Sequence, residues 1–229
     1  MAAAGDCERH FLRAQERLCL AGCARGPAAV GNGVLLLYQM ECRWHLAARE
    51  WVPEHRGAGA SKKKAQPTAV ILDSQSVKNT ATSTTRVSYD AGKRIKGRKR
   101  FFLVDTLGNL LVSWVVAASC HDGATAAQVW EALALEHELL DQVHTVFVDG
   151  GLGRRFRQQL AQRGIHVQVP TGVLAQKGRF FIHAKRWVVE RSIAWAGNNR
   201  RLAKDYERKT THANAWLYVA NIRRLARLT

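Results

Sequence analysis

The central part of the chain alternates between short apolar runs and longer segments in which apolar residues recur at helical spacing. The run Val70–Leu72 is β-branched-rich and lies between a Pro-containing segment and a Ser/Thr/Asn-rich segment, which predicts one buried strand ending at Asp73. Two further apolar runs, 101–104 and 110–118, are joined at Asp105–Asn109, which predicts a β-hairpin. Asp105 is expected to have a structural role in that turn.

Beyond the hairpin, the pattern predicts a helix, a strand, a helix and a strand, followed by a long helical region. These elements are expected at 125–140, 145–148, 153–164, 165–170, 184–196 and 213–228. The basic segment Asn198–Lys209 is expected to continue as a helix. The last helix is amphipathic, so its apolar face should pack onto the domain.

Three acidic residues occupy matching places in this pattern. Asp73 ends the first strand, and Asp149 ends the strand at 145–148, where two glycines follow and allow a ligand to approach closely. If the second of these strands lies parallel to the first, reached by a right-handed crossover, the two carboxylates meet at the rim of the sheet. Glu190 lies near the seam between the apolar and polar faces of its helix, which could carry it to that rim. The alternative for each residue is structural, as a turn cap or a surface ion pair.

Carboxylates gathered in one place repel one another and are stabilised by a divalent cation. Oxygen ligands favour Mg²⁺ or Mn²⁺. Two such ions about 3.5–4 Å apart can activate a water or hydroxyl and stabilise the leaving oxygen of a phosphodiester. We therefore expect Asp73, Asp149 and Glu190 to hold Mg²⁺ or Mn²⁺ as two ions. The predicted fold class is α/β, a mixed five-stranded sheet flanked by helices.

The charge of the chain indicates a polyanionic partner. The formal net charge is +17, and residues 67–229 hold 25 Lys and Arg against 12 Asp and Glu, a net charge of +13. Nucleic acid and anionic membrane are the usual partners of such a surface. No segment approaches the roughly 20 apolar residues that a membrane span requires, which favours DNA. The residues expected to contact it are Lys78, Lys93, Arg94, Lys96, Arg98, Lys99, Arg100, Lys185, Arg186, Arg191, Arg200, Arg201 and Lys204.

Residues 1–66 are expected to form a separate helical segment with a linker at 53–67, and residues 67–229 the main domain. The five cysteines and the absence of a convincing signal peptide predict free thiols in the cytoplasm. An alternative is a zinc site formed by three of these cysteines and one histidine, namely Cys19, Cys23, Cys42 and His45.

Several spaced motifs resemble the catalytic domain of bacterial insertion-sequence DDE transposases, in the group called insertion-sequence family 5, close to family 4. They are VILDSQSVK, YDAGKRIKGRKRFFLVDTLG, VDGG and HAKRWVVERSIAW…NNRRLAKDYE, in that order, over about residues 67–229. The resemblance implies a ribonuclease H-like fold and metal-dependent DNA strand cleavage and joining. It matches Asp73, Asp149 and Glu190 to the three catalytic acids, and Arg186 to the Arg four residues before the Glu.

The chain also departs from the family pattern. His183 stands where the related signature has Tyr, and Gly197 stands where it has Lys. Residues 34–51 are similar only to the end of the usual N-terminal DNA-binding module, so we expect a truncated or frameshifted copy.

The resemblance implies DNA partners, namely terminal inverted repeats and target DNA, and a homo-oligomer in the synaptic complex. It also implies a place in the cytoplasm on the nucleoid. Two alternatives to an active transposase remain open: an inactive DNA-binding remnant, and a ribonuclease H-like nuclease that cuts DNA without joining it.

Overall fold

The computed structural model describes residues 66–136, 140–152, 154–169 and 186–227. The chain divides into two compact units, Met1–Glu54 and His55–Thr229, and every described residue belongs to the second. The predictions for residues 1–65, including the zinc alternative, lie outside the described residues, as do those for His183 and Lys185.

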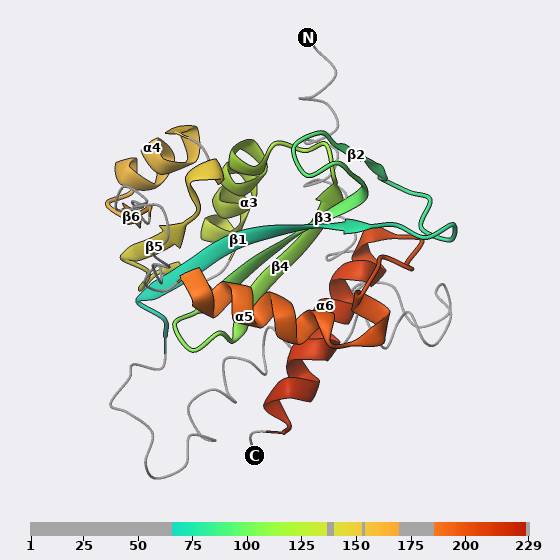
Figure 1. Ribbon diagram of the computed structural model, residues 1–229. Helices are drawn as coiled ribbons and strands as arrows, with labels where there is room; N and C mark the ends of the chain where they lie inside the picture. The colour runs from blue at the N-terminus through green and yellow to red at the C-terminus, as the bar shows by residue number, and fades with distance from the viewer. Residues whose placement is uncertain (1–65, 137–139, 153, 170–185, 228–229) are drawn as a thin grey trace, which may run out of the picture. The chain divides into compact units, whose positions relative to one another are not determined.

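A mixed sheet of six strands forms the centre of the unit (Figure 1). The strands are β1 Ala69–Lys78, β2 Ser88–Asp90, β3 Ile95–Asp105, β4 Leu110–Ala117, β5 Thr145–Val148 and β6 His166–Gln168. Their order is β2-β3-β1-β5-β6, with β4 also paired to β3. β3 is antiparallel to β1, β2 and β4, whereas β5 is parallel to β1 and β6 to β5. This arrangement confirms the predicted mixed sheet; the short strand β2 is an addition to it.

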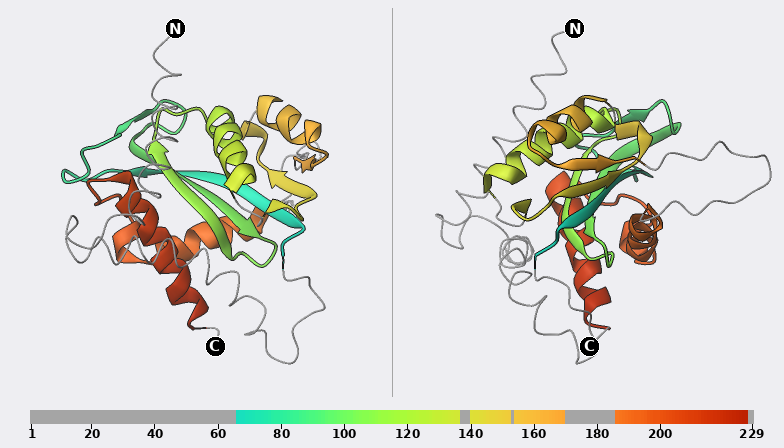
Figure 2. Two further views of the ribbon diagram at one scale, coloured as in Figure 1. Left: turned by 180° about the vertical axis from the view of Figure 1, so that it is seen from behind. Right: turned by 90° about the vertical axis from the view of Figure 1, so that its left-hand side faces the viewer.

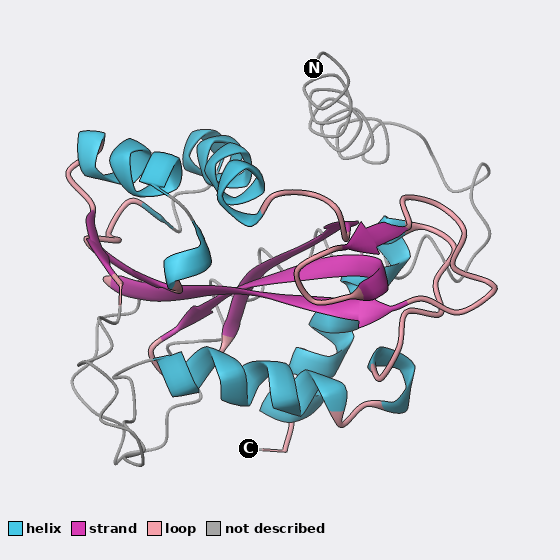
Figure 3. Ribbon diagram, turned by 45° about the horizontal axis from the view of Figure 1, so that its top comes forward, coloured by secondary structure: helices cyan, strands magenta, loops and turns pink. Residues whose placement is uncertain are grey.

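Helices cover both faces of the sheet (Figures 2 and 3). They are α3 Asp122–Glu136 and α4 Arg154–Gln162 on one face, and α5 Arg186–Gly197 and α6 Thr210–Leu225 on the other. Two short 3₁₀ turns, η3 Gly150–Leu152 and η4 Arg200–Leu202, follow β5 and α5. We call the two sides of the sheet the α3 face and the α5 face.

The α3 face carries the larger apolar core. Val70 and Leu72 of β1 pack there with alternate residues of β3 and β4 and with Trp130 of α3. Phe101 stacks on Trp114 with ring centroids 5.0 Å apart, which adds to the stabilisation from burial alone. The period-two alternation of a strand sends the residues between these ones to the α5 face.

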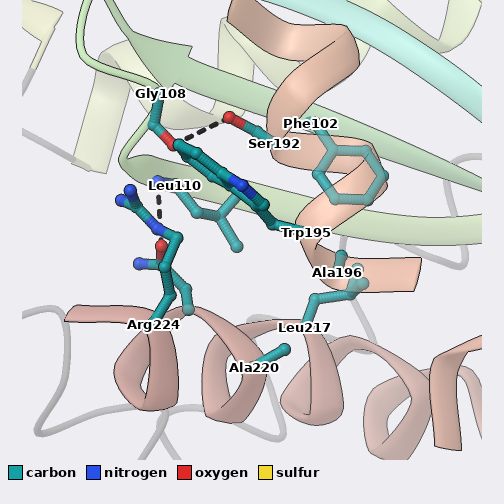
Figure 4. A pocket seen from close by; sticks show the side chains of 10 residues that line it. Phe102, Gly108, Leu110, Ser192, Trp195, Ala196, Leu217, Ala220 and Arg224 are labelled. Carbon is teal, nitrogen blue, oxygen red and sulfur yellow. Dashed lines mark hydrogen bonds between the residues drawn. The ribbon is translucent and has the colours of Figure 1, made fainter. Parts of the chain in front are cut away.

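On the α5 face, the hairpin β3–β4 packs against α5 and α6 (Figure 4). Gly108 in its turn has φ +86°, and a Cβ there would lie 2.8 Å from Ser192 Oγ, so only glycine fits. Asp105 Oδ1 accepts hydrogen bonds from the backbone N–H of Leu107 at 2.7 Å and of Asn109 at 2.9 Å. The predicted hairpin and the structural role of Asp105 are therefore confirmed.

Strand β1 is longer than predicted. It continues five residues past Asp73 to Lys78 and stays paired with β3 throughout. The added residues include Ser74, Gln75 and Ser76, which lack an apolar pattern. The serine hydroxyls are satisfied within the protein, since Ser74 donates to Asp122 at 2.9 Å and Ser76 to Asp90 at 2.6 Å. Asp73 therefore lies within β1, and only the pairing of β1 with β5 ends beside it.

The predicted helix at Asn198–Lys209 is wrong beyond its first turn. Only η4 is helical there. The carbonyls of Leu202, Glu207 and Arg208 instead accept hydrogen bonds from two buried arginine side chains of β3. A continuous helix would use those carbonyls for its own i→i+4 hydrogen bonds.

Candidate active site

Asp73 and Asp149 follow directly after a pair of residues that are neighbours in the sheet. Leu72 of β1 pairs with Val148 of β5 in parallel register. The next residue along each strand is the predicted acid, and neighbouring strands lie about 4.8 Å apart. The topology therefore places the backbones of the two acids beside each other, as the sequence predicts.

The strand alternation places both residues on the α5 face. Ile71 and Phe147 are paired and lie opposite to the core residues Leu72 and Val148. Asp73 comes two residues after Ile71, and Asp149 two residues after Phe147, so both continue that side of their strands. In β3, Phe102 is the partner of Asp73, and it is buried under α5 and α6.

The two carboxylates have matching local contacts. Asp73 Oδ1 accepts a hydrogen bond from the backbone N–H of Ser74 at 2.7 Å, and Asp149 Oδ1 accepts one from Gly150 at 2.7 Å. Both side chains are half-buried. A Cβ added at Gly151 would meet nothing within 4 Å, so the turn after Asp149 has room for a side chain there.

Glu190 is carried by α5, which packs on β1 and β3. Val188 and Val189 are buried against the sheet, at 2% and 1% exposed, whereas Glu190 is exposed. α5 therefore lies on the same face as Asp73 and carries Glu190 at a solvent-exposed position.

Among the residues that the structure describes, no three His, Cys, Asp or Glu side chains form a group that could hold a metal ion. Asp73 and Asp149 supply the oxygen donors that Mg²⁺ and Mn²⁺ favour, and they are brought together by the register of β1 and β5. Asp73 and Asp149 are therefore the two candidate ligands that this register brings together. The convergence of Glu190 on the pair stays a prediction.

The basic run at 93–100 divides between solvent and interior. Lys93, Arg94 and Lys96 are exposed, whereas Arg98, Lys99 and Arg100 are 0%, 6% and 2% exposed. Burial therefore contradicts the predicted contact with DNA for the last three. They belong to β3, where side chains with partners inside the protein replace the apolar residues that usually mark a strand.

Lys99 points to the α3 face and joins two acids there. Its Nζ lies 3.7 Å from Asp90 Oδ2, pairs with Asp122 and donates to Cys120 O at 2.9 Å. Burial raises the pKa of Asp90, but the hydrogen bonds from Ser76 and from the backbone of Lys93 and Gly92, with the charge of Lys99, outweigh it and lower that pKa. The sequence pattern does not identify this network, because its members are far apart along the chain.

Arg98 and Arg100 point to the α5 face and hold the segment after α5. Arg98 Nη1 donates to Asp205 Oδ2 at 3.0 Å and to Glu207 O at 2.7 Å, and its Nη2 donates to Arg208 O at 2.6 Å. Arg100 Nη1 donates to Leu202 O at 2.7 Å, and burial lowers the pKa of Arg100 to about 10. Neither guanidinium can contact DNA, because both are used inside the domain.

The remaining predicted cations lie on or after α5. Arg191 is held inside a stack, with its guanidinium carbon 4.4 Å from the ring centre of Trp187 and 4.5 Å from that of Trp195. It also donates to Leu107 O at 2.9 Å, so we leave it out of the DNA surface. Arg186 opens α5, and its side chain is outside the described part. The predicted cations that are exposed are Lys78, Lys93, Arg94, Lys96, Arg200, Arg201 and Lys204, and their contact with DNA stays a prediction.

The cavity between α5, α6 and the hairpin is not the candidate site. Its volume is about 20 Å³, room for about one water molecule. The lining includes Phe102, Trp195 and Leu217 and none of the three predicted acids (Figure 4).

No helix in the described ranges has the length and apolar character needed to cross a membrane.

Comparison with known proteins identifies the family. The model of the family described as transposase DDE domain matches residues 64–223. Comparison with curated proteins gave no match. Among solved structures, the chain is similar to one described as "Crystal structure of catalytic core domain of BIV integrase in crystal form I", with a TM-score of 0.40 and 16% identity, over 68% of this chain and 81% of that chain. Since the family model covers more than half of its length, this chain belongs to the family of transposase DDE domains.

Proposed function

We propose that this protein is the DNA transposase of an insertion sequence, which cleaves DNA strands at the ends of its element and joins them to target DNA. The observation that carries the proposal is the placement of Asp73 and Asp149. Two carboxylates follow paired residues of parallel strands, on the same face of the sheet, in a domain of the transposase DDE family.

The two acids and Glu190 are proposed to act on one phosphodiester. Asp73 and Asp149 would hold Mg²⁺ or Mn²⁺, which when bound acts as a Lewis acid at the phosphate. Glu190 would complete the site from α5, the helix packed on β1 beside them. The backbone hydrogen bonds to both aspartates fix the orientation of each carboxylate, which reduces the cost of positioning in the reaction.

The exposed cations would bind the DNA backbone around this site. Phosphate contacts of this kind supply affinity without reading sequence. The partners would be the terminal inverted repeats and the target DNA, bound by a homo-oligomer in the synaptic complex. Assignment to insertion-sequence family 5 or 4 remains part of the proposal.

The test is a cleavage assay with the full chain and a duplex that carries the DNA flanking its gene, in Mg²⁺ or Mn²⁺. The expected products are strand nicks at the element ends and joined strands after target DNA is added. Asp73→Asn, Asp149→Asn and Glu190→Gln should each abolish both. Asp141→Asn is the matched control, because Asp141 is exposed and is not one of the three acids. Full activity in the three variants would refute the assignment.

A second candidate is an inactive DNA-binding remnant. It would keep the exposed cations and lack the chemistry. This candidate predicts salt-sensitive DNA binding and no cleavage product with either metal. Nicks without joined products would instead indicate a nuclease.

A further inference from the structure

The far end of β1 carries a second feature, built from three segments that are distant in sequence. The loop after β1, residues 79–87, lies along the segment after η4, residues 204–209. Asp205 N donates to Lys78 O at 2.9 Å, and Thr80 N donates to Asp205 O at 2.9 Å. Thr82 Oγ1 donates to Tyr206 O at 2.8 Å, and Thr85 Oγ1 to Arg208 O. Asn79 N donates to Lys96 O of β3 at 3.4 Å.

Exposed cations occur in each of the three segments of this junction. They are Lys78, Arg86, Lys96, Lys204, Arg208 and Lys209, which we call the junction cations. Residues 74–89 contain no Asp or Glu. The two acids of the 204–209 segment are both engaged: buried Asp205 pairs with Arg98 at 3.0 Å, and Glu207 pairs with Arg201 at 2.8 Å. Both acids of the 204–209 segment are therefore paired with arginines that are not junction cations.

The backbone beneath these cations is held firmly. The Arg98 guanidinium is 0% exposed. Besides its bonds to the 204–209 segment, its Nε donates to Thr85 O at 3.0 Å and its Nη2 to the same oxygen at 2.6 Å. One buried side chain thus fastens both segments of the junction to β3. A surface ordered in advance binds a rigid polyanion at a lower entropic cost.

The distance from the candidate active site suits duplex DNA. Lys78 follows Asp73 by five residues of continuous strand, which spans about 17 Å at 3.3–3.4 Å per residue. That length equals about five base pairs at 3.4 Å per base pair. A duplex with its reacting phosphate at Asp73 and Asp149 can therefore lie across the junction.

We propose that the junction cations bind the phosphate backbone of duplex DNA about five base pairs from the reacting phosphate, and that buried Arg98 is the positioning residue that shapes this surface. This inference rests on the proposed function for its register on the DNA. The binding itself does not depend on cleavage.

The test is the salt dependence of DNA binding by the full chain, measured by fluorescence anisotropy in EDTA with a labelled duplex of about 30 base pairs between about 50 and 200 mM salt. The test variant is Lys204→Ala with Arg208→Ala. Each phosphate contact contributes about 0.9 to the slope of log K against log salt, so the slope should fall by about two. The dissociation constant should rise about tenfold or more at the lowest salt, since loss of phosphate contacts weakens binding at every sequence.

The matched control is Arg154→Ala with Arg155→Ala, which removes the same charge from exposed positions of α4 on the other face of the sheet. Its slope should stay within about 0.5 of the parent. An unchanged slope in the test variant, or an equal fall in the control, would overturn the proposal. The proposal would also be overturned if the test variant lost binding to phosphatidylserine vesicles while its DNA slope stayed unchanged, because the junction would then bind a membrane.

Because Arg98 variants risk unfolding, the role of Arg98 is tested through Thr85, whose Oγ1 accepts a hydrogen bond from Arg98 Nη2 at 3.2 Å. Thr82→Ala with Thr85→Ala removes two side-chain tethers of the junction and no charge. This variant should weaken DNA binding several-fold with the slope nearly unchanged, and an unaltered dissociation constant would contradict a positioning role. If the protein never cleaves DNA but shows the predicted slopes, the proposed function is refuted and this inference stands. If it cleaves DNA and the slopes do not change, the proposed function stands and this inference is refuted.

Discussion

The two ends of β1 differ in what surrounds them. At the acidic end, residues 69–73, β1 lies between β3 and β5, and its register with β5 places Asp73 and Asp149 side by side. At the basic end, residues 74–78, β1 is no longer paired with β5, and the segment after η4 lies next to it through the bridge between Asn79 and Asp205. One strand therefore positions negative charge at one end and positive charge at the other.

Two glycines show how differently the ends are packed. A Cβ at Gly97, which pairs with Lys78, would lie 1.9 Å from Val77 O and 2.9 Å from Asn79 N. A Cβ at Gly151, near Asp149, would meet nothing within 4 Å. Gly97 is therefore tightly enclosed by the backbone of β1, whereas a side chain has room at Gly151.

The largest expected effect is on chemistry at the acidic end. Asp149→Asn should lower the rate of DNA cleavage by a factor on the order of 10³, comparable with loss of a group that stabilises transition-state charge. Its free energy of unfolding should stay close to that of the parent or rise, because one of two adjacent like charges is removed. Single-turnover cleavage and urea unfolding measure the two quantities. A large loss of stability would instead make Asp149 a structural residue.

At the basic end, Arg98→Met should reduce the free energy of unfolding by about 3–5 kcal/mol, because it leaves the buried Asp205 carboxylate without its partner. Urea denaturation followed by circular dichroism measures the change. The double variant Arg98→Met with Asp205→Leu should recover part of the lost free energy of unfolding. If Arg98→Met alone unfolds like the parent, the guanidinium does not hold the junction.

Gly97→Ala should cost about 3 kcal/mol or more, because the clash is with backbone atoms that cannot rotate away. The matched substitution Gly151→Ala should change stability by less than about 0.5 kcal/mol. Thermal and urea unfolding of the two variants measures the difference. Equal losses would show that the surroundings of Gly151 are as closely packed as those of Gly97.

A smaller effect is expected in acid. The lowered pKa of Asp90 means that its stabilising contribution is present above the pKa of about 3.9 of an unfolded Asp and is lost as the pH falls through its lower folded value. Asp90→Asn should therefore lose less unfolding free energy than the parent between about pH 5 and 3. A pH series of urea titrations measures this. Parallel curves for the two proteins would show that Asp90 does not contribute.

The apolar strands were predictable because an apolar side chain can be buried against any other apolar side chain and needs no specific partner. Val70–Leu72 and the strand around Val146 are recognisable as buried strands from composition alone, and their parallel pairing follows from the crossover rule. The adjacency of Asp73 and Asp149 follows from the same reasoning. These are the parts in which local pattern and final fold agree.

The polar parts of the same sheet were not predictable. Arg98 is inside β3 because Asp205, 107 residues later, neutralises it. Ser76 lies in β1 because its hydroxyl finds Asp90. A hydrophobic pattern cannot report partners that are far along the chain and polar. For the same reason the approach of Glu190 to the two aspartates cannot be derived from helical spacing, and it remains a prediction.

The most direct test of the account is a double-mutant cycle on DNA cleavage with Asp73→Asn, Asp149→Asn and the two combined. Residues that act as one unit show strongly non-additive losses. We expect each single variant to lose nearly all cleavage and the double variant to lose no more. A cleavage rate close to the parent in either single variant, or independent losses that multiply in the double, would contradict a shared site at the rim of β1 and β5.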